Sequence, residues 1–226
     1  MADQVATPAG GSPRRVVLAT RNAHKVAELS RILAATGAGV SLVGLDVFPD
    51  APDVPETGLT FADNALLKAR AIAEHTGLPA VADDSGLCVD TLHGMPGVLS
   101  ARWSGKHGDD QANLDLVLGQ LEDIAQRGAQ FICAAALVLP ASPAASTPAP
   151  GISEMPGGHE RTVTGVLSGT LARAPRGSNG FGYDPIFVPD GGQRTTAELA
   201  PAEKDAISHR GRAFRALAPL IADALS

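Results

Sequence analysis

Two adjacent carboxylates and a hydroxyl stand together between two apolar runs, where residues 82–86 read ADDSG. Neighbouring carboxylates oppose each other's ionisation unless a cation compensates, so a divalent metal is a natural partner. Oxygen ligands of this kind favour Mg²⁺ over zinc. The sequence predicts a turn that displays Asp83 and Asp84, with Glu56 from a neighbouring loop as a second carboxylate for the metal. An ordinary surface turn is the alternative interpretation.

A polar, cationic junction lies between the first apolar run and the helix pattern that follows it, where residues 18–29 read LATRNAHKVAEL. A helix N-terminus offers unpaired backbone N–H groups and the positive end of the helix dipole. Thr20, Arg21, Asn22 and Lys25 add side-chain donors at the same place. The G-x-x-x-x-G-K-[ST] pattern of a Walker loop is absent. We interpret the junction as an anion-binding site, with a capped turn and solvated cations as the alternative.

Two later segments are suited to a planar ligand. Residues 180–187 read GFGYDPIF, in which glycines allow close backbone approach while Phe181 and Tyr183 offer aromatic faces for stacking a base. Aromatic residues at this spacing also fit a hydrophobic core. Residues 203–211 read EKDAISHRG and place three side chains at the predicted start of the last helix, where they can hydrogen-bond a base or a phosphate: Lys204, His209 and Arg210. A solvated helix start is the alternative there.

The apolar patterns predict the elements that position these residues. Strands are expected at residues 16–19 and 40–43, and a helix is expected to begin at Thr60 and Asp63 and to end at Gly77. Strands and helices alternate without a strict βαβ order, which indicates an α/β fold with a mixed sheet. The length of 226 residues fits one such domain or two lobes around a cleft.

Domain organisation is predicted from local composition. Residues 1–13 are expected to form a flexible N-terminal cap, and residues 14–226 a single two-lobed domain. A stretch rich in Pro, Ala, Ser and Gly at 140–160 is expected to be an exposed hairpin insertion. Cys88 and Cys133 lie in apolar runs without metal-binding spacing, so we expect core residues in a reducing compartment.

The overall charge restricts the partners of the chain. A formal net charge of -6 argues against a broad nucleic-acid-binding face, because phosphate-backbone binding depends on many Lys and Arg side chains. No apolar run reaches transmembrane length, and the N-terminus lacks an apolar signal core. A cytoplasmic protein that binds neither nucleic acid nor membrane is therefore predicted.

Six segments, in this order and with fitting spacing, closely resemble the inosine/xanthosine triphosphate pyrophosphatase family: TRNAHK, ETGLTFADNALLKA, ADDSGLCVD, GMPGVLSARWSG, FGYDPIFVP and EKDAISHRG. The resemblance extends over residues 16–225. It implies an elongated mixed β-sheet with flanking helices, two lobes around a central substrate cleft, and a homodimer. It also implies Mg²⁺-dependent hydrolysis of dITP, ITP and XTP to the monophosphate and pyrophosphate, which removes deaminated purine nucleotides from the pool.

The resemblance implies a role for each motif. Asp84 would be the general base, Glu56 and Asp84 would hold the metal, and Ser85 would contact the substrate. Arg21 stands where the family often has glycine. The remaining substrate-binding residues implied by the family fall into a phosphate-binding segment and a nucleoside pocket: Thr20, Arg21, Asn22, Ala23, His24 and Lys25 for the triphosphate, and Phe181, Gly182, Tyr183, Asp184, Lys204, His209 and Arg210 for the nucleoside.

Two other functions remain open at this stage. A pyrophosphatase for pyrimidine or modified nucleotides would prefer dTTP or UTP over ITP. A non-catalytic nucleotide sensor would be stabilised by its ligand without releasing pyrophosphate. The pair Asp83 and Asp84 argues against the sensor, because a site that only binds anions gains nothing from two carboxylates.

Overall fold

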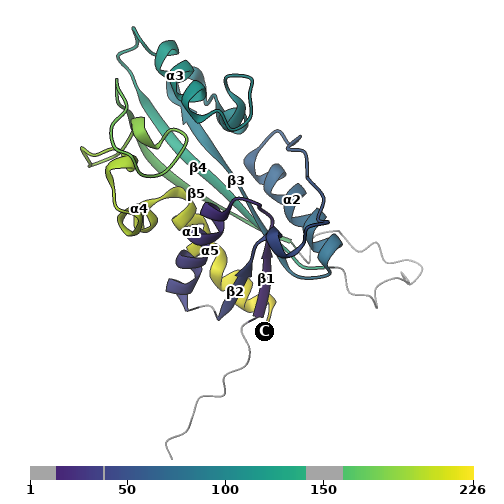
Figure 1. The fold of residues 1–226 in the computed structure, drawn as a ribbon. Coiled ribbons are helices and arrows are strands. Elements are labelled where there is room, and N and C mark those ends of the chain that lie inside the picture. Colours follow the sequence, from purple (N-terminus) through teal and green to yellow (C-terminus); the bar gives the residue numbers. More distant parts are fainter. Residues whose placement is uncertain (1–13, 38, 141–159) are drawn as a thin grey trace, which may run out of the picture.

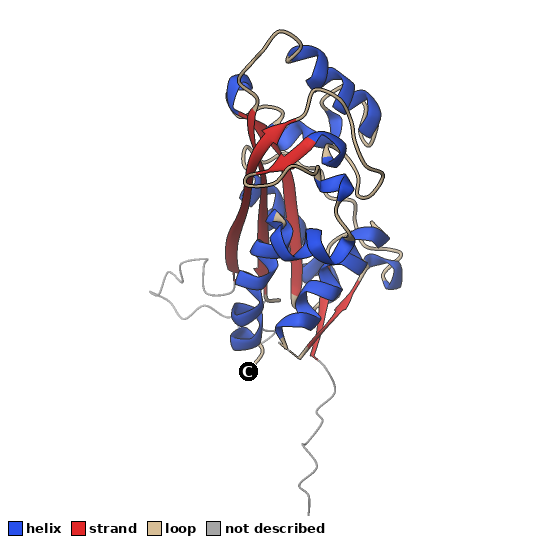
Figure 2. Ribbon diagram, turned by 90° about the vertical axis from the view of Figure 1, so that its left-hand side faces the viewer, coloured by secondary structure: helices blue, strands red, loops and turns tan. Residues whose placement is uncertain are grey.

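A six-stranded mixed sheet runs through the molecule, with helices on both faces (Figures 1 and 2). The computed structural model describes residues 14–37, 39–140 and 160–226. The strand order is β2-β1-β3-β4-β5-β6. Strand β1 pairs in parallel with its two neighbours, β2 and β3, and all other neighbouring strands pair antiparallel. This confirms the predicted fold class. The bounds are β1 (Arg14–Leu18), β2 (Val40–Val43), β3 (Ala80–Val89), β4 (Gly128–Val138), β5 (Glu160–Leu171) and β6 (Phe187–Pro189).

The helices begin and end largely where local signals predict. A capping box joins Thr60 and Asp63 at the start of α2, and Gly77 closes that helix with φ 65°. The predicted last helix is in fact two helices, because Ser208 is extended and its hydroxyl caps α5 by accepting a hydrogen bond from the Gly211 amide. The bounds are α1 (Ala23–Thr36), α2 (Phe61–Thr76), α3 (Asp110–Gln120), α4 (Pro201–Ile207) and α5 (His209–Ala224).

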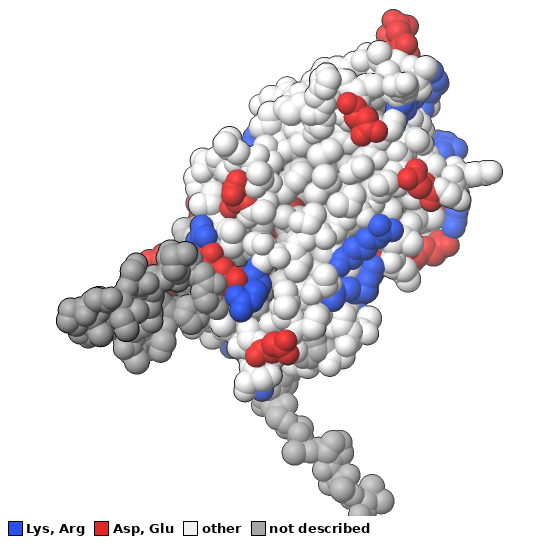
Figure 3. Space-filling view, turned by 180° about the vertical axis from the view of Figure 1, so that it is seen from behind, with Lys and Arg blue, Asp and Glu red and all other residues white. Residues whose placement is uncertain are grey.

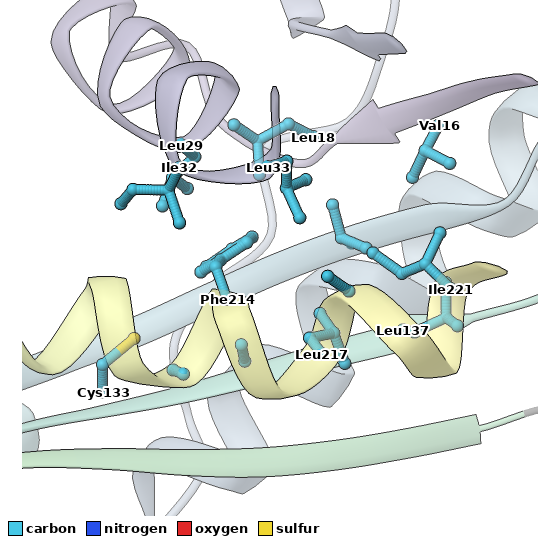
Figure 4. Close-up of a cluster of buried hydrophobic side chains, with 14 residues drawn as sticks. Val16, Leu18, Leu29, Ile32, Leu33, Cys133, Leu137, Phe214, Leu217 and Ile221 are labelled. Atoms are coloured by element: carbon cyan, nitrogen blue, oxygen red, sulfur yellow. The ribbon is translucent and has the colours of Figure 1, made fainter. Parts of the chain in front are cut away.

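Different helices cover the two faces of the sheet. Helices α1 and α5 bury the odd-numbered residues of β3 and β4, such as Val81 and Cys133, in one hydrophobic cluster (Figure 4). Helix α2 buries even-numbered residues of the same strands, such as Ala82 and Ala136, in another. The alternation follows from strand geometry, in which successive side chains point to opposite faces. We call the end of the molecule that contains these two clusters the α5 lobe.

A third cluster forms the opposite end of the molecule, which we call the α3 lobe. Leu114, Val117 and Leu121 of α3 pack there against Leu87 of β3 and Phe187 of β6. Beside them, the 3₁₀ helix η3 (Gly97–Arg102) lies against β3. The three long strands β3, β4 and β5 extend into both lobes (Figure 1).

The predicted acidic turn at ADDSG is wrong, because β3 continues through it. Asp83 pairs with Ala135 of β4 and Gly86 pairs with Ile132, so antiparallel hydrogen bonding keeps the polar stretch extended. A Cβ atom at Gly86 would lie 2.3 Å from the Ser100 hydroxyl, so glycine at this position permits the close approach of η3 rather than a turn. The first strand also begins two residues earlier than predicted, because Arg14 and Arg15 pair with β2.

Some predictions fall outside the described residues. These are the N-terminal cap at 1–13 and all but the ends of the 140–160 insertion, although the strands that flank the insertion pair antiparallel, with Val138 opposite Glu160. Within the described ranges, no helix is both long enough and apolar enough to cross a membrane.

On the face in Figure 3, small groups of both charges lie among uncharged residues. Cys133 is buried as predicted, while Cys88 is half-buried.

Candidate active site

A cleft of about 1250 Å³ lies between the two lobes and collects most of the predicted site residues. Ala23, exposed in the first turn of α1, is not among the residues that line it, and the side chain of His24 is not among those described. The predicted residues that do line the cleft are Thr20, Arg21, Asn22, Lys25, Glu56, Asp84, Ser85, Phe181, Gly182, Tyr183, Asp184, Lys204, His209 and Arg210.

Asp83 and Asp84 face opposite sides of the sheet, because both belong to the continuous strand β3. Asp83 points to the α1 and α5 side, where its carboxylate accepts hydrogen bonds from Lys25 and Arg210. Asp84 points to the α2 side, where it accepts a hydrogen bond from Asn64. The two carboxylates therefore do not form one metal-binding pair. The sequence predicted that a shared cation compensates both, whereas each carboxylate has its own partners on its own side of the sheet.

Asp83 is the centre of a buried ion-pair network. The Lys25 ammonium lies 3.1 and 3.0 Å from its two oxygens, and the Arg210 Nε lies 3.3 Å away. Arg210 also donates to the Ser85 hydroxyl at 2.8 Å and lies 3.9 Å from Glu28. Burial opposes the charge of Asp83, but Lys25 and Arg210, together with the more distant Lys68, outweigh it and hold the pKa of this carboxyl well below its usual range. Asp83 is thus ionised and positions the cations around it.

Asp84 has a different environment. Its Oδ2 accepts from Asn64 at 2.9 Å, its Oδ1 accepts from the Ser85 amide at 3.1 Å, and the Lys68 ammonium is 3.7 Å away. Burial raises the pKa of Asp84, and the nearby Glu56 carboxylate adds to the rise, although Lys68 opposes it. A carboxylate with a raised pKa that lines a cleft has the character of a general base.

Glu56 shares the Lys68 ammonium with Asp84. Lys68 lies 2.7 Å from Glu56, and Arg102 donates to the Glu56 carboxylate at 3.4 Å and to its carbonyl at 3.3 Å. Burial opposes ionisation, but Lys68 outweighs it and lowers the pKa of Glu56. The two carboxylates thus already hold a cation between them, and their hard oxygens fit Mg²⁺.

The metal-ligand set is small. In the described part of the chain, no group of three or more His, Cys, Asp or Glu side chains is arranged to hold a metal ion. A pair of carboxylates is nevertheless compatible with Mg²⁺, which is commonly bound by one or two carboxylates together with substrate phosphates and water. Glu56 and Asp84 therefore fit a metal that arrives with a phosphorylated substrate.

The other end of the cleft is a pre-arranged pocket around Asp184. This buried carboxylate accepts hydrogen bonds from Lys204, from the Phe181 amide at 2.9 Å and from Thr196 at 2.8 Å. The Phe181 ring lies over two cations, 5.4 Å from the Lys204 ammonium and 5.0 Å from the Arg210 guanidinium. Phe181 is 37% exposed and offers its ring to the cleft.

His209 and Tyr183 differ in what they can offer a ligand. Burial, together with the nearby Arg210, lowers the pKa of His209 well below its usual value, so the imidazole is neutral. Its ring stacks on Phe131 at 4.8 Å, and its Nδ1 is buried without a hydrogen-bond partner among the described residues. Tyr183 is buried, and its hydroxyl donates to the Ser100 carbonyl at 2.9 Å. Tyr183 therefore fits the core interpretation better than the stacking one.

The model of the Ham1 family matches residues 16–220. The chain belongs to the Ham1 family. A protein of Streptomyces coelicolor named dITP/XTP pyrophosphatase is 60% identical over 213 residues, which cover 93% of this chain and 98% of that protein. A solved HAM1 protein from Coxiella burnetii is 42% identical with a TM-score of 0.77, covering 93% of this chain and 99% of its own.

A second solved structure is the nucleoside-triphosphatase / dITP/XTP pyrophosphatase from Mycobacterium abscessus. It is 56% identical to this chain with a TM-score of 0.68, and the match covers 92% of this chain and 99% of that chain. These findings confirm the family resemblance and the fold class that the motifs of this Ham1 protein predicted.

Sequence reasoning missed three residues of the Ham1 site: Asn64, Lys68 and Arg102. For two of them a signal was present. Asn64 and Lys68 are four residues apart on the face of α2 that also buries Ala65 and Ile72, so they interrupt an apolar stripe. A polar pair on a buried helix face needs partners, which here are Asp84 and Glu56. Arg102 carries no comparable local signal.

Proposed function

We propose that this Ham1 protein is a nucleoside triphosphate pyrophosphatase that hydrolyses dITP, ITP and XTP to the monophosphate and pyrophosphate. It would thereby remove deaminated purine nucleotides from the pool. The observation that carries the proposal is one cleft that contains a carboxylate of raised pKa, a cationic helix start and a pocket capped by an aromatic ring. The names of relatives at 60% identity support it.

The reaction is an in-line attack of water on the α-phosphorus, with pyrophosphate as the leaving group. Asp84 accepts the proton of the attacking water, while Asn64 and the Ser85 amide keep its carboxylate in place. Glu56 and Asp84 would hold Mg²⁺, which when bound would neutralise charge on the phosphate oxygens. The Lys68 ammonium adds fixed positive charge at this end of the cleft.

The phosphate chain would lie on the start of α1. There the Thr20 hydroxyl accepts from the backbone amide of Asn22 at 3.2 Å, and the side-chain Oδ1 of Asn22 accepts from the backbone amide of Lys25 at 3.2 Å. These bonds shape the junction whose remaining N–H groups and positive dipole end attract an anion. The proposed ligands at this end are Thr20, Arg21, Asn22, Ala23, His24, Lys25 and Ser85.

The purine would lie beside Phe181, in the pocket that also includes Gly182, Tyr183, Asp184, Lys204, His209 and Arg210. Hypoxanthine and xanthine present a 6-oxo acceptor where adenine presents an amino donor. Arg210 or a backbone N–H facing that position would be left unpaired by ATP, at a cost of about 1–3 kcal/mol per buried group. That cost selects against ATP. Guanine shares the 6-oxo group, so rejection of GTP requires exclusion of its 2-amino group.

A homodimer, a cytoplasmic location and Mg²⁺ as the metal complete the proposal. The homodimer and the metal are supported by the family resemblance, and Mg²⁺ also by the oxygen donors of Glu56 and Asp84. The rival enzyme for pyrimidine or modified nucleotides would use the same cleft with a different preference. A non-catalytic sensor would bind without turnover.

The test is pyrophosphate release with Mg²⁺ from a panel of ITP, XTP, dITP, ATP, GTP, dTTP and UTP. Release confined to ITP, XTP and dITP is the expected result. Preference for dTTP or UTP would replace the proposal with the pyrimidine enzyme. No release from any nucleotide, with ITP still raising the melting temperature, would replace it with the sensor.

A further inference from the structure

One ion pair joins the two walls of the cleft next to Asp84. Arg102 is the last residue of η3, on the α3 lobe, whereas Glu56 lies in the loop that leads to α2. The Arg102 guanidinium donates to the Glu56 carboxylate at 3.4 Å and to its carbonyl at 3.3 Å, and both residues line the cleft. The carboxylate is the one proposed to hold the metal.

The backbone that carries Arg102 is firmly held. Ser100, two residues earlier, accepts a hydrogen bond from the Leu87 amide at 2.9 Å through its hydroxyl. Its carbonyl accepts another from Tyr183 at 2.9 Å. Because η3 is fixed to β3 and to the core of the α3 lobe, a change of partner by Arg102 requires movement of its side chain alone.

The contact of Arg102 with Glu56 is loose. Both distances are longer than the usual 2.7–3.2 Å range for N–H···O bonds. The side chains of Arg102 and Glu56 are 30% and 23% exposed, and a partly solvated pair of this kind contributes little stability. Glu56 also has a closer partner, since Lys68 lies 2.7 Å away. Arg102 can therefore exchange this carboxylate for a stronger anion at low cost.

Charge balance determines when the exchange takes place. Two carboxylates, Glu56 and Asp84, face two cations, Lys68 and Arg102. A divalent cation on the carboxylates would take Glu56 from Arg102 and leave Lys68 with only Asp83 as a compensating charge. The phosphate chain of a nucleotide supplies the missing negative charge, and a guanidinium pairs with phosphate oxygens in a bidentate manner.

We propose that Arg102 is a further substrate-binding residue, which leaves Glu56 when metal and nucleotide bind and donates to the phosphate chain from the α3 lobe. The inference rests on the proposed function, because it needs a metal-bound polyphosphate in this cleft. Glu56 is the temporary partner of Arg102 in the ligand-free protein.

The test compares Arg102→Met and Arg102→Lys with wild type, with Arg70→Ala as the matched control. Arg70 is an exposed arginine of α2 that pairs with Glu160 at 2.7 Å. Two binding affinities are measured by calorimetry: that of Mn²⁺ alone, and that of inorganic triphosphate in the presence of Mg²⁺. Arg102→Met keeps the aliphatic stem, and thermal unfolding checks that each variant is folded.

We expect Arg102→Met to weaken triphosphate binding by about 10- to 100-fold, the range for hydrogen bonds to charged groups. Arg102→Lys should show a smaller loss, because lysine keeps the charge without the bidentate geometry. The affinity for Mn²⁺ alone should stay the same or rise, since a competing cation has been removed. Arg70→Ala should match wild type in both measurements.

Two results would overturn the inference. Equal losses of Mn²⁺ and triphosphate affinity would mean that Arg102 only positions Glu56. Unchanged triphosphate binding in Arg102→Met would exclude a phosphate contact. Pyrophosphate release from ITP by the wild-type protein is measured in parallel: if it is present while Arg102→Met binds triphosphate normally, the inference alone fails. If it is absent, the proposed function fails, and the inference that rests on it falls with it.

Discussion

The two faces of β3 carry neighbouring acids with contrasting environments. On the α5 side, Asp83 is 3% exposed and bonded to two cations, with its pKa held low. On the α2 side, Asp84 has a raised pKa, and the nearest ammonium is 3.7 Å away. Asp83 and Asp84 are therefore adjacent in the strand but differ in character: Asp83 holds the cations of the site in place, whereas Asp84 is less compensated and has the raised pKa.

Under the proposed function, one short strand segment serves both structure and reactivity. A fully compensated carboxylate cannot accept a proton at neutral pH, because its cations stabilise the charged form. A carboxylate with a raised pKa can do so more readily, but it stabilises the fold less. The division of labour between Asp83 and Asp84 leads to three predictions, which come in order of expected effect.

Asp84→Asn should lower the rate of pyrophosphate release from ITP by about 10²- to 10⁴-fold, the usual cost of losing a general base. The asparagine keeps the shape of the side chain, so the urea midpoint should stay close to wild type. Stopped assays of pyrophosphate, with unfolding curves as the control, measure both. Near-normal turnover would remove Asp84 from the mechanism and end the contrast between the two faces.

Asp83→Asn should instead lower the free energy of unfolding by about 3–5 kcal/mol, because it leaves Lys25 and Arg210 as buried cations without their carboxylate. The stabilisation by Asp83 is present above the unfolded pKa of about 3.9 and is lost as pH falls toward its lower folded pKa. Urea unfolding at neutral and acid pH measures it. A stable Asp83→Asn variant with no turnover would assign Asp83 to catalysis rather than structure.

The smallest of the three expected effects is the pH dependence of stability that His209 causes. This residue lies on the same side of the sheet as Asp83. The unfolded chain binds a proton near pH 6.5 but the folded protein does not, since the pKa of His209 is lowered. The free energy of unfolding should therefore fall below about pH 6.5 by up to roughly 1.4 kcal/mol per pH unit. His209→Gln should flatten this slope. An unaltered slope in His209→Gln would contradict a neutral imidazole.

Local signals in the sequence predicted much of the fold. The capping box at Thr60 and Asp63 and the glycine at Gly77 define α2, because capping depends on residues within one turn. The run at residues 40–43 is β2 as predicted. The segment around Asp84 was misjudged, since acidic and small residues favour turns locally while pairing with β4 keeps them in a strand.

The sequence by itself determined which residue types are available for chemistry, the family, and most element boundaries. The tertiary structure alone decided which face each acid occupies and which cation each one meets. Arg210 and Asp83 are 127 residues apart, and Arg102 and Glu56 are 46 apart. Such pairs depend on strand alternation and on the packing of distant helices, which local sequence patterns do not encode.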